Sequence, residues 1–127
     1  MPSSPPPWIT ELARRLVEHE ASVTPAEQLS AAFRVCETLR QPLSQLVGVS
    51  GFRSLLSRAL IMSHERARWL KAVHVAGNGT LEGMVDAQAR LPPDEIAQGE
   101  IFLISNIIRL LVTFIGEELT LDRKSVV

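Results

Sequence analysis

Hydrophobic positions recur along most of this chain at intervals of three or four residues, which is the spacing of amphipathic helices. Residues 8–20 give the first such helix, with charged side chains on its opposite face. Residues 24–41 give a second, which begins with Thr24 as N-cap and Pro25 at the first helical position. Pro42 is expected to end that helix.

The middle of the chain predicts a bend, a long helix and a second break. Residues 42–51 indicate a short helical turn followed by a bend marked by glycine. Residues 52–73 form the longest helix that the pattern predicts, and it ends at HVAGNGT, residues 74–80. We expect Thr80 to cap a shorter helix over roughly residues 80–90.

The last helix contains the most apolar stretch, IFLISNIIRLLVTFIG, residues 101–116. It follows two prolines and opens with acidic residues, which are favourable near a helix N-terminus. The stretch is shorter than the ~20 residues that span a bilayer. It also contains Arg109, which costs roughly 2.5–3.5 kcal/mol at a bilayer centre. The pattern therefore predicts a central core helix and not a membrane span, with Gly116 as a kink or an end.

A strip of polar side chains interrupts the apolar surface of this last helix. Placed at about 100° per residue, its members fall on one narrow face: Ser105, Asn106, Arg109, Thr113 and Glu117. Three interpretations remain open, namely a solvent-exposed face, a contact between helices or subunits, and the polar lining of a ligand pocket. In the pocket interpretation, Trp69 and Phe114 provide apolar walls.

A basic face follows from the predicted helix over residues 52–73. It comprises Arg53, His64, Arg68 and Lys71, and Glu65 is the only acid in that helix. The simplest interpretation is a solvated face that lies opposite acids elsewhere in the fold. The functional interpretation is a patch for an acidic partner, a phosphate or a nucleic acid.

No catalytic or metal-binding motif is complete. HERAR, residues 64–68, resembles a zinc-protease motif, but Arg68 stands where the second histidine is needed. Cys36 falls on the buried face of its predicted helix, which is typical of a core residue and not of a nucleophile. We therefore expect no enzyme activity, no metal and no cofactor.

Residues 42–60 imitate a DNA-binding helix-turn-helix, with a short helix, a glycine turn and a second helix. When Gly48 is aligned with the turn, Ser54 and Ser57 occupy positions where aliphatic side chains should be buried. The register is therefore wrong by one residue, and DNA binding is not favoured.

Composition restricts the function classes further. The 127 residues suit one domain, and 46% of them are hydrophobic, as in an ordinary globular protein. A net charge of −1 argues against nucleic acid and anionic membranes as partners. The single cysteine excludes an internal disulfide and favours the reducing cytoplasm.

These patterns together predict an all-α, single-domain bundle of four to five helices, with the apolar C-terminal helix at its centre. A disordered Pro/Ser-rich tail is expected over residues 1–7, the helical domain over 8–121 and a frayed tail over 122–127.

GFRSLLSRAL, residues 51–60, and LLVTFIGEELTL, residues 110–121, resemble segments of a recurrent family of small, uncharacterised all-helical bacterial proteins. The resemblance implies a bacterial cytoplasmic protein without an assigned activity, and it transfers no residue role. In that family the last segment continues as a further helix, whereas here LDRKSVV stops early.

The sequence thus favours a non-enzymatic protein–protein interaction module that forms a homodimer through its last helix. Another protein partner is possible, whereas membrane and nucleic acid are not expected. Two alternatives remain: a small-ligand binder or sensor with a pocket between helices, and DNA binding through residues 43–60.

Overall fold

The computed structural model describes the backbone of residues 5–23 and 31–126, and the side chains of residues 5–20 and 31–116. The fold is all-α, as predicted, with the C-terminal helix packed against the others. Its four α-helices are α1 Pro7–Val23, α2 Ala31–Ser63, α3 Met84–Gln88 and α4 Pro93–Val126.

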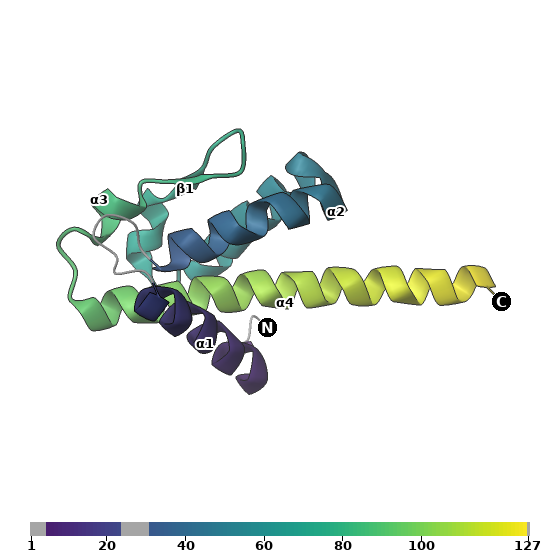
Figure 1. Cartoon of the computed structure of the whole chain (residues 1–127), viewed down its shortest axis with the longest axis horizontal. Helices are drawn as coiled ribbons and strands as arrows, with labels where there is room; N and C mark the ends of the chain where they lie inside the picture. The colour runs from purple at the N-terminus through teal and green to yellow at the C-terminus, as the bar shows by residue number, and fades with distance from the viewer. Residues whose placement is uncertain (1–4, 24–30, 127) are drawn as a thin grey trace.

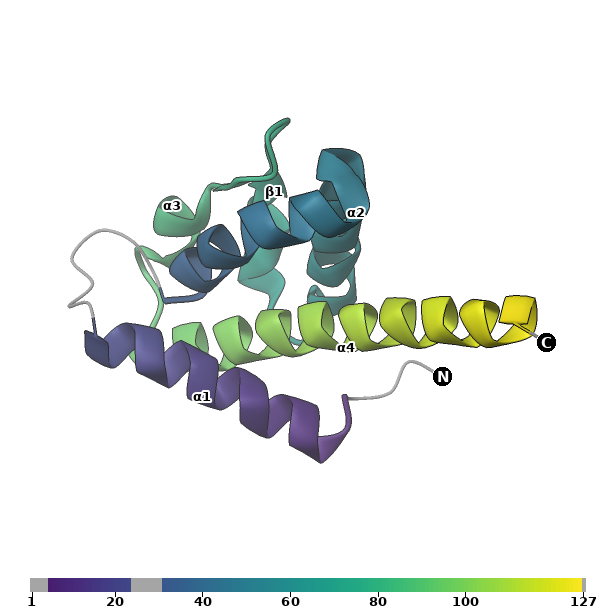
Figure 2. The ribbon, with the colours of Figure 1, turned by 45° about the vertical axis from the view of Figure 1, so that its right-hand side comes forward.

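α4 is the axis on which α1 and α2 pack, and both Figure 1 and Figure 2 show it running past them. A rise of 1.5 Å per residue makes the 34-residue α4 about 51 Å long, against about 26 Å for the 17-residue α1. The first part of α4 is therefore covered by its neighbours, while its C-terminal part extends beyond them.

The core lies where α1 and α2 meet the covered part of α4. Leu103, Ile104 and Ile107 of α4 are completely or almost completely buried, together with Phe52 and Leu56 of α2. Each such side chain contributes roughly 1.5–3 kcal/mol by leaving water. The apolar stretch of residues 101–116 thus provides the centre of the fold, as expected.

α2 is bent back on itself at Gly48, as Figure 1 shows. Gly48 has φ 84°, a conformation that other residues adopt only with strain. The bend expected over residues 42–51 is confirmed. The expectation that Pro42 ends the helix is wrong, because Pro42 lies inside α2 and the chain reverses only at Gly48.

The predicted helix over residues 52–73 is wrong in its second half. α2 ends at Ser63, and the backbone amides of Arg66 and Ala67 then both donate to the Ser63 carbonyl in a turn. A separate 3-10 helix, η1, covers Arg68–Ala72. The Ser63 hydroxyl donates to the Ala59 carbonyl at 2.8 Å, which gives this buried hydroxyl an acceptor within its own helix.

A small hairpin replaces the helix that was expected to begin at Thr80. Strand β1, His74–Val75, pairs antiparallel with β2, Leu81–Glu82. In the turn between them, the Gly79 amide donates to the Ala76 carbonyl at 3.0 Å, and the Thr80 amide donates to the Asn78 Oδ1 atom at 3.1 Å. The expected cap at Thr80 is therefore wrong, and α3 starts only at Met84.

The remaining helix predictions divide into three groups. The helix predicted over residues 8–20 is confirmed by α1, and the acidic start of the last helix is confirmed at Asp94 and Glu95. Gly116 neither ends nor interrupts α4. Thr24, Pro25 and residues 1–4 of the expected tail lie outside the described residues.

Candidate functional site

The polar strip of α4 does not form one surface. Asn106 is only 1% exposed, and its Nδ2 atom donates to the Ser63 Oγ atom of α2 at 2.9 Å. Ser105 is also buried, and its hydroxyl donates to the Ile101 carbonyl at 2.7 Å. The solvent-face interpretation is therefore wrong for Asn106, which lies in a contact between two helices of the same chain.

The rest of the strip lies at the boundary of the fold and beyond it. Arg109 is partly buried, whereas Thr113 is exposed and its hydroxyl donates to the Arg109 carbonyl at 3.0 Å. The side chain of Glu117 lies outside the described part. The strip divides in this way because it runs from the covered part of α4 into the uncovered part.

The two expected pocket walls, Trp69 and Phe114, are far apart. Trp69 packs so closely on Gly99 that a Cβ atom there would lie 2.5 Å from its Cζ2 atom. Phe114 comes fifteen residues after Gly99 on the same helix, which corresponds to about 22 Å. The structure therefore does not bring Trp69 and Phe114 together around one ligand.

A hollow that Trp69 and Phe114 do not line lies beside Asn106 and Arg109. Its volume is about 310 Å³, near the lower limit of small-molecule sites. The Arg66 guanidinium lies over the Phe102 ring at 5.1 Å from its centroid. Ile61, Met62 and Glu65 complete the lining.

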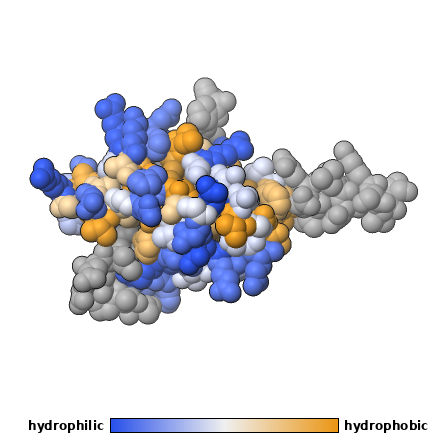
Figure 3. Space-filling model, turned by 90° about the horizontal axis from the view of Figure 1, so that it is seen from above, coloured by the Kyte–Doolittle hydropathy of each residue, from blue (hydrophilic) through white to orange (hydrophobic). Residues whose placement is uncertain are grey.

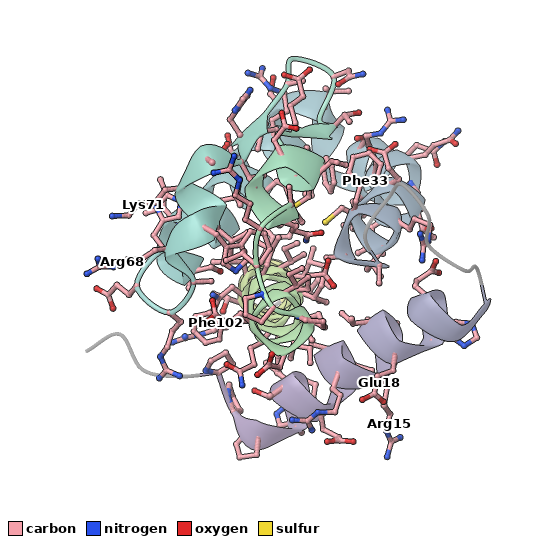
Figure 4. The ribbon with its side chains drawn as sticks, turned by 90° about the vertical axis from the view of Figure 1, so that its left-hand side faces the viewer. Arg15, Glu18, Phe33, Arg68, Lys71 and Phe102 are labelled. Atoms are coloured by element: carbon pink, nitrogen blue, oxygen red, sulfur yellow. The ribbon has the colours of Figure 1, made fainter. Side chains whose placement is uncertain are left out.

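The expected basic face is not one face. Arg53 belongs to α2, whereas Arg68 and Lys71 belong to η1 and point outward from it in Figure 4. His64 lies in the turn between them, and its Nε2 atom is buried without a hydrogen-bond partner. The prediction assumed a continuous helix, and α2 ends before three of the four residues.

A groove lies between the second half of α2 and the uncovered part of α4. Its volume is about 420 Å³. We call it the α2–α4 groove, and it is lined by Val47, Gly51, Ser54, Leu55 and Arg58 of α2 and by Leu110, Thr113 and Phe114 of α4. Its floor is apolar, and it is open to solvent.

One side of this groove is a hydrophilic surface of α2, which we call the Ser/Arg wall. It consists of Ser50, Arg53, Ser54, Ser57 and Arg58, and with Ile61 these residues line a second hollow. Ser54 and Arg58 belong to both hollows. Spacings of three and four residues place the wall on one helical face.

Apolar side chains are exposed at the α2 bend and on α4. They are Leu46 and Val49 on α2, and Val112, Phe114 and Ile115 on α4, and of these only Phe114 lines the groove. Figure 3 shows hydrophobic side chains reaching the surface beside the point where α4 leaves the bundle. Grouped apolar exposure of this kind marks interaction sites more often than isolated exposed residues do.

The Ser/Arg wall carries two arginines that no described acid neutralises. The sequence contains no acid between Glu37 and Glu65, and no acid among the described side chains lines either hollow. Arg14, Arg15, Arg34 and Arg40 each form an ion pair with a glutamate. Within the described side chains, Arg53 and Arg58 form none.

Sequence reasoning missed the groove and did not count Arg58 among the four residues of the basic face. The signal was present, because Ser50, Arg53, Ser54, Ser57 and Arg58 share one helical face. The predicted helix ran past Ser63, where α2 ends, so Arg53 was grouped with Arg68 and Lys71 and not with Arg58.

The remaining side chains that could act as nucleophiles, bases or metal ligands are buried or dispersed. Cys36 is buried, and burial, followed by the charges of Glu37 and Glu100, raises the pKa of its thiol to about 12. His74 faces Glu82 at 3.3 Å across the hairpin, and both side chains are exposed. Among the described residues, no three His, Cys, Asp or Glu side chains gather where they would hold a metal ion.

The chain matches no protein-family model, no curated protein and no solved structure. The resemblance to small bacterial helical proteins therefore stays a prediction.

Two helices in the described part are long and apolar enough to cross a membrane by length and composition alone, Ala31–Ser63 and Pro93–Gly116. This is weak evidence, since the core helix of a soluble protein meets the same test. The first of them is also bent at Gly48.

Proposed function

We propose that the protein is a non-enzymatic helical interaction module that forms a homodimer through the uncovered end of α4. The observation that carries this proposal is the exposure of Val112 and Ile115, at 44% and 45%, on a helix that continues past its neighbours. The single cysteine and near-zero net charge support a cytoplasmic setting.

The physical argument concerns how the end of α4 is stabilised. Helices shorter than ~12–15 residues are marginal in water, and in proteins their stability comes mainly from packing an apolar face. Within the described side chains, α4 lacks such packing on the side of Val112 and Ile115. A second copy offers the same surface, so a two-fold axis would bury both at once, as in most homodimers.

Light scattering across a range of protein concentrations tests this proposal. We expect a mass of twice the 14.0 kDa of the chain. The variant Val112→Glu with Ile115→Glu should be a monomer with unchanged helical circular dichroism, because both side chains are already exposed. Val85→Glu makes the same kind of change at another exposed position, on α3, and should remain a dimer.

A monomeric wild-type protein at every concentration would overturn the dimer. The small-ligand alternative would then rest on the hollow lined by Arg66, Phe102, Asn106 and Arg109. It predicts that an aromatic carboxylate such as benzoate raises the melting temperature, and that Phe102→Ala abolishes this increase.

A further inference from the structure

We propose that the α2–α4 groove binds an acidic amphipathic helix of another protein. Apolar side chains of that helix would contact Leu55, Leu110 and Phe114, and its carboxylates would contact Arg53 and Arg58. This inference goes beyond the homodimer, because it uses the opposite side of α4.

The two surfaces of α4 are separate by helical geometry. At about 100° per residue, Leu110, Thr113 and Phe114 fall within a sector about 100° wide, and all three line the groove. Val112 and Ile115 fall on average about 180° away from that sector. A dimer formed through Val112 and Ile115 therefore leaves the groove accessible.

The groove has the shape and chemistry of a helix-in-groove site. Its walls are two helices, and Val47, Leu55, Leu110 and Phe114 make its lining largely apolar. The described strands have only two residues each, so they offer a poor edge for strand addition. A volume of about 420 Å³ accommodates a few apolar side chains projecting from one face of a helix.

The charge of the Ser/Arg wall determines which kind of partner helix fits the groove. Arg53 and Arg58 provide two guanidinium groups without an acid among the described side chains. Ser50, Ser54 and Ser57 add hydroxyl donors along the same wall. Guanidinium groups bind carboxylates with strong, charge-assisted hydrogen bonds, so acidic residues beside an apolar stripe match this site.

A nucleic acid fits the same groove less well. It would use the arginines but leave the apolar floor formed by Leu55, Leu110 and Phe114 unmatched. Proteins that bind nucleic acids usually carry many basic side chains and a positive net charge, whereas this chain has a net charge of −1.

The first test is fluorescence anisotropy with a labelled peptide of about three heptads, with Leu at positions a and d and Glu at e and g. A matched peptide with Lys at e and g is the control. We expect the acidic peptide to bind the full-length chain with an affinity that falls as salt is raised, and the basic peptide not to bind.

Charge reversal tests the Ser/Arg wall. Arg53→Glu with Arg58→Glu should weaken binding of the acidic peptide by at least about fivefold and create binding of the basic peptide. Arg68→Glu with Arg90→Glu imposes the same change of net charge at exposed sites outside the groove and should change neither affinity.

A second variant tests the apolar floor. Phe114 is 36% exposed, so Phe114→Glu should fold normally and lose the acidic peptide, whereas Val85→Glu should retain it. Val112→Glu with Ile115→Glu should retain it too. The experiments can therefore overturn the groove proposal and the homodimer proposal independently of each other.

Five results would overturn the proposal. The first is no binding of the acidic peptide, the second is equal binding of both peptides, and the third is no effect of charge reversal. In the fourth, duplex DNA binds in place of the acidic peptide and the same reversal abolishes that binding, which assigns the wall to nucleic acid. In the fifth, the acidic peptide binds only after Val112→Glu with Ile115→Glu, which means that a second copy fills the groove.

Discussion

Asn106 of α4 and Ser63 of α2 form a hydrogen bond in the interior of the fold, with 2.9 Å between Nδ2 and Oγ. Neither side chain is more than 1% exposed. Ser63 in turn donates from its hydroxyl to the Ala59 carbonyl at 2.8 Å. The two central helices are thus joined by a short polar chain that begins at Asn106 and ends on the backbone.

Ser63→Ala should lower the free energy of unfolding by about 1–3 kcal/mol, because it leaves a buried amide without an acceptor. Adding Asn106→Leu should restore part of the loss, since both polar partners are then replaced by apolar groups. Urea unfolding of both single variants and the double variant measures the coupling. Strictly additive losses would contradict a direct interaction.

Close packing of Trp69 on Gly99 gives a second prediction. A Cβ atom on Gly99 would lie 2.5–2.8 Å from three atoms of the indole ring, which is closer than atoms can approach. Gly99→Ala should therefore destabilise the protein by about 1–3 kcal/mol, despite the higher helix propensity of alanine.

The matched control for this prediction is a smaller side chain at position 69. In a Trp69→Leu background, Gly99→Ala should cost less than in the wild type, because the indole ring that it meets is gone. An equal cost in both backgrounds, measured by thermal unfolding, would show that the indole is not what constrains Gly99.

At two other glycines, substitution by alanine should change the stability of the protein in opposite directions. A Cβ atom would meet nothing within 4 Å at either Gly48 or Gly116. Gly48 has φ 84°, so Gly48→Ala should destabilise the protein by about 1 kcal/mol or more through backbone strain. Gly116 lies within α4, so Gly116→Ala should stabilise the helix by up to about 1 kcal/mol. Chemical unfolding of both variants measures the two changes in stability. If both changes had the same sign, the backbone conformation of Gly48 would not explain them.

The fold class and the central role of residues 101–116 were predictable from the sequence, because both depend on a long apolar pattern. One error arose at the end of α2. Nothing in the apolar pattern around Ser63 shows that the helix ends there and that a turn leads into η1. The expected helix was therefore too long, and the basic face drawn on it placed Arg68 and Lys71 beside Arg53.

The candidate site was less predictable than the fold. Asn106 on a helical wheel looks like part of a polar surface, because the wheel does not show which neighbour covers each side. The bend at Gly48 brings the second half of α2 across α4, which covers Asn106 and leaves Phe114 at the edge. The burial of Asn106 and the exposure of Phe114 depend on tertiary packing, which the hydrophobic periodicity of the sequence does not predict.

Cys36 gives a pH-dependent prediction whose sign follows from its environment. Burial, and then the charges of Glu37 and Glu100, raise the pKa of the thiol from 9.0 to about 12. The folded state therefore holds the proton more tightly than the unfolded state. This contribution to stability is fully present below pH 9 and is lost as the pH rises from 9 toward 12. The loss should approach about 1 kcal/mol per pH unit within that range.

Cys36→Ala provides the comparison, because it removes the titrating group and leaves the other ionisable side chains in place. The chain contains no tyrosine, so few other groups titrate in the same range. Urea unfolding of the wild type and Cys36→Ala at pH 7, 9, 10 and 11 should give a stability difference that is constant up to pH 9. Above pH 9 that difference should shift against the wild type, since only its unfolded state can release a thiol proton easily. Parallel stability curves across the whole range would mean that Cys36 ionises equally in both states and is not held in a closed core.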